Sequence, residues 1–244
     1  MKKILYALGK RAAPTVLKTR WIYRSLTGTE SEKIEAEYLM GCHLASMTIR
    51  EQKLFDDPET AEWLQSLLAR LSLTVVNRDR KFQVRCVEGL EPNAFALPGG
   101  FIFITRSLLQ LCDYDTDETA FVLGHEMGHV LRSHSLNRLL ASEVVQLLAR
   151  GSPLKGAMNP AMRQLIRQLV TQGYSRRQEF EADQVGAKIV KVAGFAPEAG
   201  IRLLKRLGEI SNGPAGPGSY FASHPPVAAR IQRLRRVLPD SLIG

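Results

Sequence analysis

The amino-acid sequence predicts an α+β fold that is mainly helical and contains one small antiparallel sheet. The chain has 244 residues, of which 45% are hydrophobic, which is enough to bury the core of one domain. Most segments repeat apolar residues at helical spacing, whereas only three short segments show strand patterns. We therefore divide the chain into a basic N-terminal arm, residues 1–30, and one folded domain, residues 31–244.

Helices are expected at the start of the domain. Apolar residues recur at helical spacing from residue 31 to about residue 55, and Asp57 and Pro58 then interrupt the pattern. A second helix is expected to run from there through Leu71.

Three strands are expected next. Residues 81–87 alternate apolar and polar side chains, and residues 101–105 are rich in aromatic and β-branched ones. Between residues 93–97 and 101–105, Pro98 suits the second position of a type II turn, and Gly99 allows the positive φ of the third. These strands should form the small sheet.

Capping patterns mark the starts of two later helices. Asp115 with Glu118, and Ser175 with Gln178, have the spacing of a capping box. The first of these helices is expected to continue through the 120s and 130s. The remaining helical segments are residues 139–150, residues 160–170, a helix from Pro197 through Leu207, and a basic helix after Pro225 and Pro226.

The cysteine content argues against a disulfide framework. Cys42, Cys86 and Cys112 are an odd number and form no C-x-x-C pair. Cys42 and His43 are neighbours, which point about 100° apart on a helix, so they do not form a catalytic pair. We expect three buried thiols in a reducing compartment.

The net charge of +9 is concentrated in the basic arm, where seven basic residues precede the first acidic residue, Glu30. Apolar residues are interleaved with them, which suits contact with an anionic membrane surface. A solvated terminus is the simpler alternative, and nucleic acid is not expected as a partner. The basic residues are Lys2, Lys3, Lys10, Arg11, Lys18, Arg20 and Arg24.

No signal peptide or membrane-spanning segment is predicted. The apolar run over residues 4–9 is short for a signal-peptide core, and no stretch of about 18 apolar residues occurs. We expect a cytoplasmic protein with peripheral contact to the membrane. A periplasmic or organellar location is the alternative, because the Arg-rich, acid-poor start also resembles a transit peptide.

The strongest chemical signal is an H-E-x-x-H pattern, His125-Glu126-Met127-Gly128-His129, inside a predicted helix. Histidines at i and i+4 lie on one face, so both imidazoles can bind one ion while Glu126 points beside it. Gly124 and Gly128 are costly inside a helix, which indicates the close approach of another backbone. The pattern predicts one zinc ion per chain, with Glu126 as the catalytic base.

A third ligand must come from another segment. His134 is nine residues from His125, about 180° round a continuous helix, and should not reach the same ion. In the later capped helix, Glu179 and Asp183 share an inward stripe, whereas Glu181 lies on a polar stripe that should face water. Glu179 is therefore the candidate ligand, and Asp183 is placed to accept a hydrogen bond from a ligand histidine.

These motifs resemble those of the zinc endopeptidases typified by HtpX and the CAAX prenyl endopeptidases. The resemblance covers roughly residues 35–238 and matches the soluble branch of that family, since membrane helices are lacking. It implies a zincin-like metallopeptidase domain with Glu179 as the third ligand and a His-Pro segment near the active site. The matching segments are residues 125–129, 175–183, 93–100 and 223–226, with Arg230 and Ile231.

The predicted reaction is hydrolysis of peptide bonds in unfolded or damaged proteins, a role in protein quality control. Glu126 would take a proton from a zinc-bound water as the water attacks the carbonyl. Arg176, His224 and Tyr220 are candidate donors to the oxyanion, and His224 could instead cap the zinc. The residues expected to pair with an extended substrate are Asn93, Ala94, Phe95 and Ala96.

Two other functions are left open by the residues. A zinc hydrolase of non-peptide amides or esters would use the same water, because a fold does not determine its substrate. A chaperone-like or adaptor protein would keep zinc for structure, with four protein ligands and no water.

Overall fold

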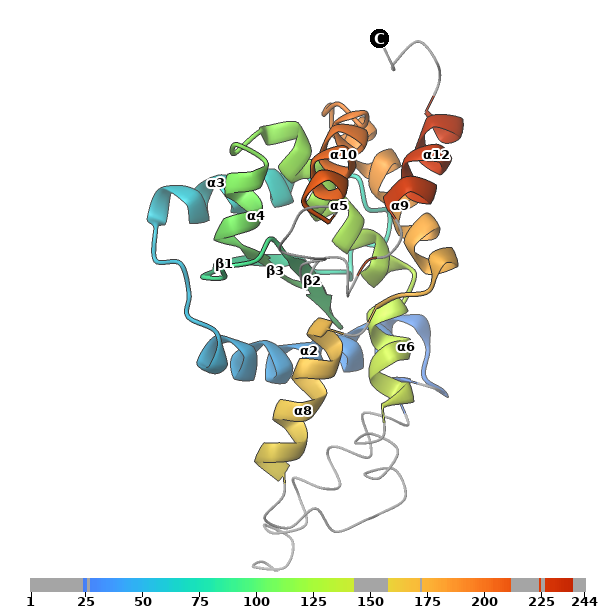
Figure 1. Ribbon diagram of the computed structural model, residues 1–244. Helices are drawn as coiled ribbons and strands as arrows, with labels where there is room; N and C mark the ends of the chain where they lie inside the picture. Colours follow the sequence, from blue (N-terminus) through green and yellow to red (C-terminus); the bar gives the residue numbers. More distant parts are fainter. Residues whose placement is uncertain are drawn as a thin grey trace, which may run out of the picture.

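The computed structural model describes residues 24–25, 27–142, 158–171, 173–211, 224 and 227–238. Helices surround a three-stranded sheet in these residues (Figure 1). The prediction of a mainly helical α+β fold is therefore confirmed. Most of the basic arm, residues 1–23, and the predicted helical residues 143–150 lie outside the described part of the chain.

Two helices precede the sheet, as the sequence predicts. α2 (Glu30–Glu51) begins with a complete capping box between Thr29 and Glu32. α3 (Pro58–Ser72) follows Asp57, whose side chain accepts a hydrogen bond from the N–H of Thr60. In Figure 1, α2 lies on one side of the sheet and α5 on the other.

The sheet has the order β1-β3-β2 and is mixed, which corrects the purely antiparallel prediction. β2 (Ala94–Leu97) and β3 (Phe101–Thr105) form the predicted antiparallel hairpin, with Gly99 at φ +81°. β1 (Gln83–Val87), however, runs parallel to β3. Alternation along a strand shows which side chains are buried, but it carries no information about the direction of a non-consecutive partner.

α5 (Thr116–Leu131) carries the H-E-x-x-H pattern and is shorter than predicted. Asp115 caps its N-terminus through the N–H of Glu118, but the Glu118 carboxylate contacts Arg202 instead of completing the capping box. The helix ends because Ser133 takes a left-handed conformation, with φ +56°. The chain then changes direction and begins a separate helix, α6 (His134–Ala141).

α9 (Arg176–Val192) begins with the complete capping box predicted between Ser175 and Gln178. It packs along α5, and the two glycines that directly precede His125 and His129 allow this close approach. A Cβ at Gly128 would lie 2.7 Å from the Ala182 carbonyl oxygen, and one at Gly124 would lie 3.1 Å from that of Gly186. The predicted backbone contact is therefore confirmed.

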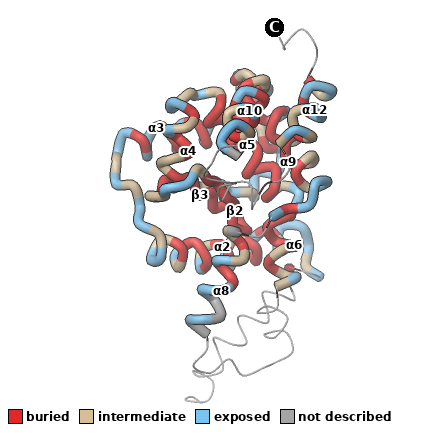
Figure 2. Tube along the Cα trace, viewed as in Figure 1, coloured by how far each residue is buried: buried red, intermediate tan, exposed pale blue. Residues whose placement is uncertain are grey.

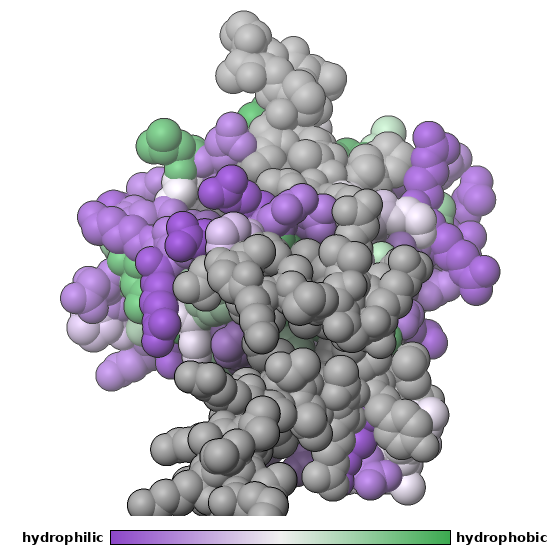
Figure 3. All heavy atoms as spheres, turned by 90° about the horizontal axis from the view of Figure 1, so that it is seen from below, coloured by the Kyte–Doolittle hydropathy of each residue, from purple (hydrophilic) through white to green (hydrophobic). Residues whose placement is uncertain are grey.

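The remaining helices complete the shell around the core, which is buried between the helices and the sheet (Figure 2). Seen from below, the described surface is mainly hydrophilic, with scattered hydrophobic side chains (Figure 3). No helix among the residues described is long and apolar enough to cross a membrane. The other helices are α4 (Arg106–Leu111), α8 (Met158–Thr171), α10 (Ala199–Ser211) and α12 (Val227–Val237).

The cysteines are unpaired, as predicted, but they are not equally buried. Cys86 and Cys112 lie in the core, and burial raises the pKa of Cys86 to about 12. Cys42 on α2 is only partly buried.

Candidate metal centre

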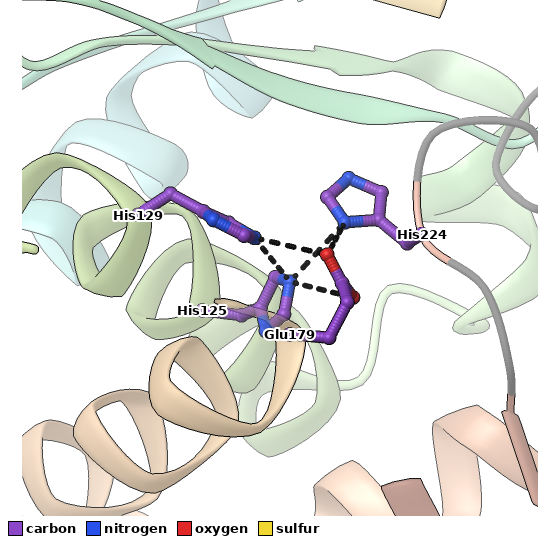
Figure 4. Close-up of side chains that lie close together, drawn as sticks. All are labelled: His125, His129, Glu179 and His224. Carbon is purple, nitrogen blue, oxygen red and sulfur yellow. Dashed lines mark hydrogen bonds and ion pairs between the residues drawn. The ribbon is translucent and has the colours of Figure 1, made fainter. Parts of the chain in front are cut away.

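Four side chains from three separate segments of the sequence meet between α5, α9 and residue 224 (Figure 4). Each offers one potential ligand atom, and all four atoms lie within 4.8 Å of one another. All four residues are buried, so water does not solvate them freely. They are His125, His129, Glu179 and His224.

The spacing of these atoms suits a tetrahedral metal ion. The Nε2 atoms of His125 and His129 are 3.1 Å apart, and the Glu179 carboxylate oxygens lie 3.3 Å from His129 Nε2 and 3.7 Å from His125 Nε2. Zinc–nitrogen bonds of about 2.0–2.1 Å place tetrahedral ligands about 3.3 Å apart. Two imidazoles and one carboxylate are also a ligand set that zinc accepts.

His125 is oriented by a buried ion pair. Its Nδ1 lies 2.9 Å from Asp183 Oδ1 and donates its hydrogen to that carboxylate, which leaves the Nε2 lone pair facing the cluster. Asp183 in turn accepts hydrogen bonds from the fully buried guanidinium of Arg230, at 2.8 and 2.9 Å. The structure thus places Asp183 where the sequence predicted it, and it adds Arg230, which the sequence identified only as a motif match.

His129 is oriented by a second histidine, His134. The two Nδ1 atoms are 3.0 Å apart, and His134 Nε2 lies 3.3 Å from Glu181 Oε2. A carboxylate only accepts, so His134 donates its Nε2–H to Glu181 and uses Nδ1 to accept from His129. Burial lowers the pKa of His134, which favours this neutral form. The Nε2 lone pair of His129 therefore faces the cluster as well.

His134 is not one of the four clustered residues, in agreement with the expectation that it does not reach the same ion. The structure adds that it contacts His129 from beside the cluster. The left-handed Ser133 ends α5 and turns the chain back, so that the first residue of α6 contacts His129. A non-glycine residue in this conformation costs about 1–3 kcal/mol, which the contacts around it must offset.

The inward stripe of α9 is buried, as predicted, and carries both Glu179 and Asp183. Glu181 is only partly exposed, at 31% of its side chain, because it pairs with His134 as well as with the exposed Arg177. The prediction that it faces water is therefore only partly right.

The charges around Glu179 and Asp183 keep both carboxylates ionised. Burial raises the pKa of Glu179, but His224 and Arg230 outweigh it and hold that pKa well below its usual range. For Asp183, burial also raises the pKa, but Arg230 and His125 lower it to about 2. Burial holds the pKa of His129 well below its usual value, so its imidazole stays neutral.

Glu126 lies beside the cluster and is 1% exposed. Neither oxygen of its carboxylate has a hydrogen-bond partner in the part of the chain that the structure describes. A basic group close to it is the His224 imidazole, whose Nε2 is 3.6 Å from Glu126 Oε1. A buried carboxylate without hydrogen bonds is costly, which points to a role in chemistry.

The other predicted site residues lie in different places. Ala94, Phe95 and Ala96 form most of β2, an edge strand in the order of the sheet, and Asn93 precedes it. These four residues are buried. Arg176 is exposed at the start of α9, so the structure does not bring it into the cluster. Tyr220 lies outside the described residues.

One residue at the centre is not marked by any motif in the sequence. Tyr174 lies directly before the Ser175 cap, and its ring stacks on the imidazole of His129, with centroids 3.7 Å apart and an interplanar angle of 16°. Its position before a recognisable cap was the only available signal.

Comparisons with known proteins all point to one family of metallopeptidases. Residues 58–238 match peptidase family M48. The mitochondrial metalloendopeptidase OMA1 of Schizosaccharomyces pombe is 30% identical over 189 residues, which cover 75% of this chain and 55% of that protein. The metalloprotease LoiP of Escherichia coli is 31% identical over 149 residues, 59% of this chain and 57% of LoiP.

A third relative matches more of the chain at lower identity. The beta-barrel assembly-enhancing protease of Yersinia pestis is 26% identical over 219 residues, which cover 83% of this chain and 44% of that protein. The chain spans about half the length of each of these three relatives.

Proposed function

The chain belongs to peptidase family M48, and from this premise we propose that it is a zinc-dependent endopeptidase with Glu126 as its base. The observation that carries the proposal is that two imidazole lone pairs and the Glu179 carboxylate converge beside Glu126. The Glu126 carboxylate is buried and has no hydrogen-bond partner among the described residues. The relatives named above are metalloendopeptidases and proteases, which supports the same activity.

The proposed zinc ligands are His125, His129 and Glu179. A cation between them removes the repulsion between electron pairs that otherwise face one another at 3.1 to 3.7 Å. A zinc ion held there would lower the pKa of a bound water and polarise the scissile carbonyl. Glu126 would accept the proton of the water as it attacks and would then deliver that proton to the leaving amine.

His224 is proposed to cap the centre in a resting state. Its Nδ1 lies 3.0 Å from Glu179 Oε1 and 3.4 Å from His125 Nε2, while its Nε2 lies 3.4 Å from the Ala94 carbonyl oxygen. As a neutral imidazole that donates its Nε2–H to Ala94, His224 would keep its Nδ1 lone pair available to a metal. It would then hold the fourth position, which a water needs for catalysis.

The same contacts connect the cap with the substrate. An extended peptide that adds to the edge strand β2 would compete with His224 for the Ala94 carbonyl. Pairing through the backbone requires an unfolded segment, which supports unfolded or damaged proteins as the substrate class. Displacement of His224 by such a segment would free the fourth position and admit water in one step.

The decisive experiment compares Glu126→Gln with the unchanged protein on casein, with and without a chelator. We expect metal-dependent hydrolysis by the unchanged protein and its loss in Glu126→Gln, with an equimolar amount of zinc still bound, because the residue is a base and not a ligand. Hydrolysis by the Glu126→Gln variant would contradict the mechanism. Turnover of small esters but of no unfolded protein would favour the non-peptide hydrolase.

A non-catalytic zinc protein is the second candidate, because the cluster offers four protein donors. The variant His224→Ala distinguishes a peptidase from a non-catalytic zinc protein. If His224 is a removable cap, the variant should hydrolyse casein faster, since water gains the fourth position. If His224 donates to the oxyanion, activity should fall about 10²-fold with zinc retained. Loss of zinc without any activity would favour a structural site.

The basic arm is proposed to contact anionic membrane surfaces. Deletion of residues 1–26 removes the seven basic residues that precede Glu30 and none of the proposed site residues. The shortened chain should hydrolyse casein normally but bind less to vesicles that contain phosphatidylserine. Equal vesicle binding by both chains would contradict the membrane proposal alone.

A further inference from the structure

The phenol of Tyr174 is a buried polar group that the proposed mechanism does not yet use. The residue is 6% exposed, and its hydroxyl has no hydrogen-bond partner among the residues that the structure describes. Removing a hydroxyl from water without giving it a partner costs free energy, so such groups are rare in folded proteins. The hydroxyl therefore needs either a partner that arrives later or another reason to be present.

The ring of Tyr174 is held firmly at the metal centre. The His129 imidazole stacks on one face at a centroid distance of 3.7 Å, and the Arg138 guanidinium lies 4.1 Å from the ring centre. Since the stacked imidazole occupies one face, Arg138 covers the other. The His224 ring lies 5.7 Å away. These contacts restrict the ring, so the hydroxyl is positioned before any ligand binds.

The phenol is a hydrogen-bond donor at neutral pH, because a phenol keeps its proton up to about pH 10 even in water. The side chain is buried, so water does not compete freely for the hydroxyl. A donor that is already held in place can stabilise an anion that forms beside it without reorganising its dipole.

The proposed peptidase reaction needs such a donor. Attack on a peptide carbonyl places negative charge on its oxygen, which hydrogen-bond donors must stabilise. Arg176 is exposed, and His224 already contacts Glu179 and Ala94. We propose that Tyr174 is a further catalytic residue, whose hydroxyl donates a hydrogen bond to the scissile carbonyl oxygen as that oxygen becomes anionic. This inference rests on the proposed peptidase function.

Tyr174→Phe tests the inference cleanly, because it removes the hydroxyl and keeps the ring stacked on His129. We expect kcat on casein-derived peptides to fall about 10²-fold, with KM changed less than about threefold. Zinc affinity should stay unchanged. The midpoint of thermal unfolding should stay equal or rise, since an unpartnered buried hydroxyl is removed. Tyr114→Phe, an exposed tyrosine that packs against Trp63, is the matched control and should change none of these quantities.

A purely structural tyrosine gives a different result. If the hydroxyl is only an unsatisfied core group, Tyr174→Phe will be at least as stable as the unchanged protein and equally active, which overturns the inference. A loss of zinc affinity in Tyr174→Phe would also overturn it, because the effect would then run through His129.

An equilibrium measurement separates this inference from the proposed function. A phosphinic peptide, which mimics the tetrahedral intermediate, should bind the zinc-loaded Tyr174→Phe variant at least tenfold more weakly than the unchanged protein. If the unchanged protein holds zinc but neither hydrolyses peptides nor binds the phosphinate, the proposed function and the inference both fail. If it does both and Tyr174→Phe matches it, only the inference fails.

Discussion

The two histidines of the H-E-x-x-H pattern lie one helical turn apart, yet their surroundings differ. His125 donates to Asp183, whose charge is matched by Arg230, and all three side chains are almost completely buried. His129 donates to His134, a neutral imidazole that in turn donates to the partly exposed Glu181. Glu181 also pairs with Arg177, whose side chain is 88% exposed and which is the last residue in this series of contacts.

The partners of His125 should contribute to the stability of the fold, whereas the partners of His129 should mainly orient its imidazole. On the His125 side, ionised groups are buried together, so the loss of one leaves the others without a counter-charge. On the His129 side, the contacts are hydrogen bonds between neutral rings that end at a solvated ion pair, so each step outward is screened more strongly by water. We therefore expect substitutions on the His125 side to affect folding and metal binding, and those on the His129 side to affect mainly metal binding.

Removal of Arg230 should have the largest effect. Arg230→Met keeps the volume of the side chain but leaves the buried carboxylates of Asp183 and Glu179 without their cation. We expect the free energy of unfolding of the metal-free protein to fall by about 3–5 kcal/mol. Urea denaturation measures this loss, with Arg236→Met on the exposed face of α12 as the control. A loss no larger than that of the control would remove the distinction between the two sides.

The pH dependence of stability should reveal the same ion pair. The pKa of Asp183 is about 2 in the folded chain, below its ordinary value of 3.8. Its stabilising contribution is therefore complete above pH 3.8 and disappears as the pH falls through about 2. In chelator-treated samples, the stability difference between the unchanged protein and Asp183→Asn should shrink over this interval. A difference that stays constant from pH 5 to pH 2 would show that Asp183 carries no charge of importance there.

Measurements of zinc affinity allow a direct comparison of the His125 side with the His129 side. Asp183→Asn removes a charged acceptor, and we expect zinc affinity to fall about 10–100-fold. His134→Phe removes the acceptor of His129 but keeps a ring of similar shape, and we expect a loss of about tenfold. His134→Gln can accept from His129 and donate to Glu181, so it should restore much of the affinity. Competition with a chromogenic chelator gives all three values, and equal affinities for Phe and Gln at this position would contradict the hydrogen-bond role.

Substitutions at Arg177 and Glu181, the residues farthest from the metal centre on the His129 side, should change zinc affinity least. Arg177→Ala breaks an exposed ion pair, and we expect zinc affinity to change less than about twofold. Arg176→Ala, on the same exposed turn, is its control. Glu181→Gln keeps an acceptor for His134 and should change the affinity little, whereas Glu179→Gln should lower it strongly. A large effect at Glu181 would mean that its charge, and not merely its oxygen, orients the two histidines.

Local periodicity determined the parts of the site that lie within one helix. The i, i+4 spacing of His125 and His129 and the inward stripe of Glu179 and Asp183 follow from helix geometry, and the Ser175 cap marks where that helix begins. Gly124 and Gly128 even indicated that another backbone would pack there, and α9 is that backbone. These features depend only on residues a few positions apart, so a single sequence reveals them.

Tertiary structure alone decided the rest, because those features depend on turns and long-range packing. His134 reaches His129 only because Ser133 takes a left-handed conformation that a helical pattern does not reveal. Arg230 is a motif match in the sequence, but only the structure shows that its guanidinium pairs with two buried carboxylates of α9. The parallel pairing of β1 with β3 is non-local in the same way, since neither strand carries a mark of its partner's direction.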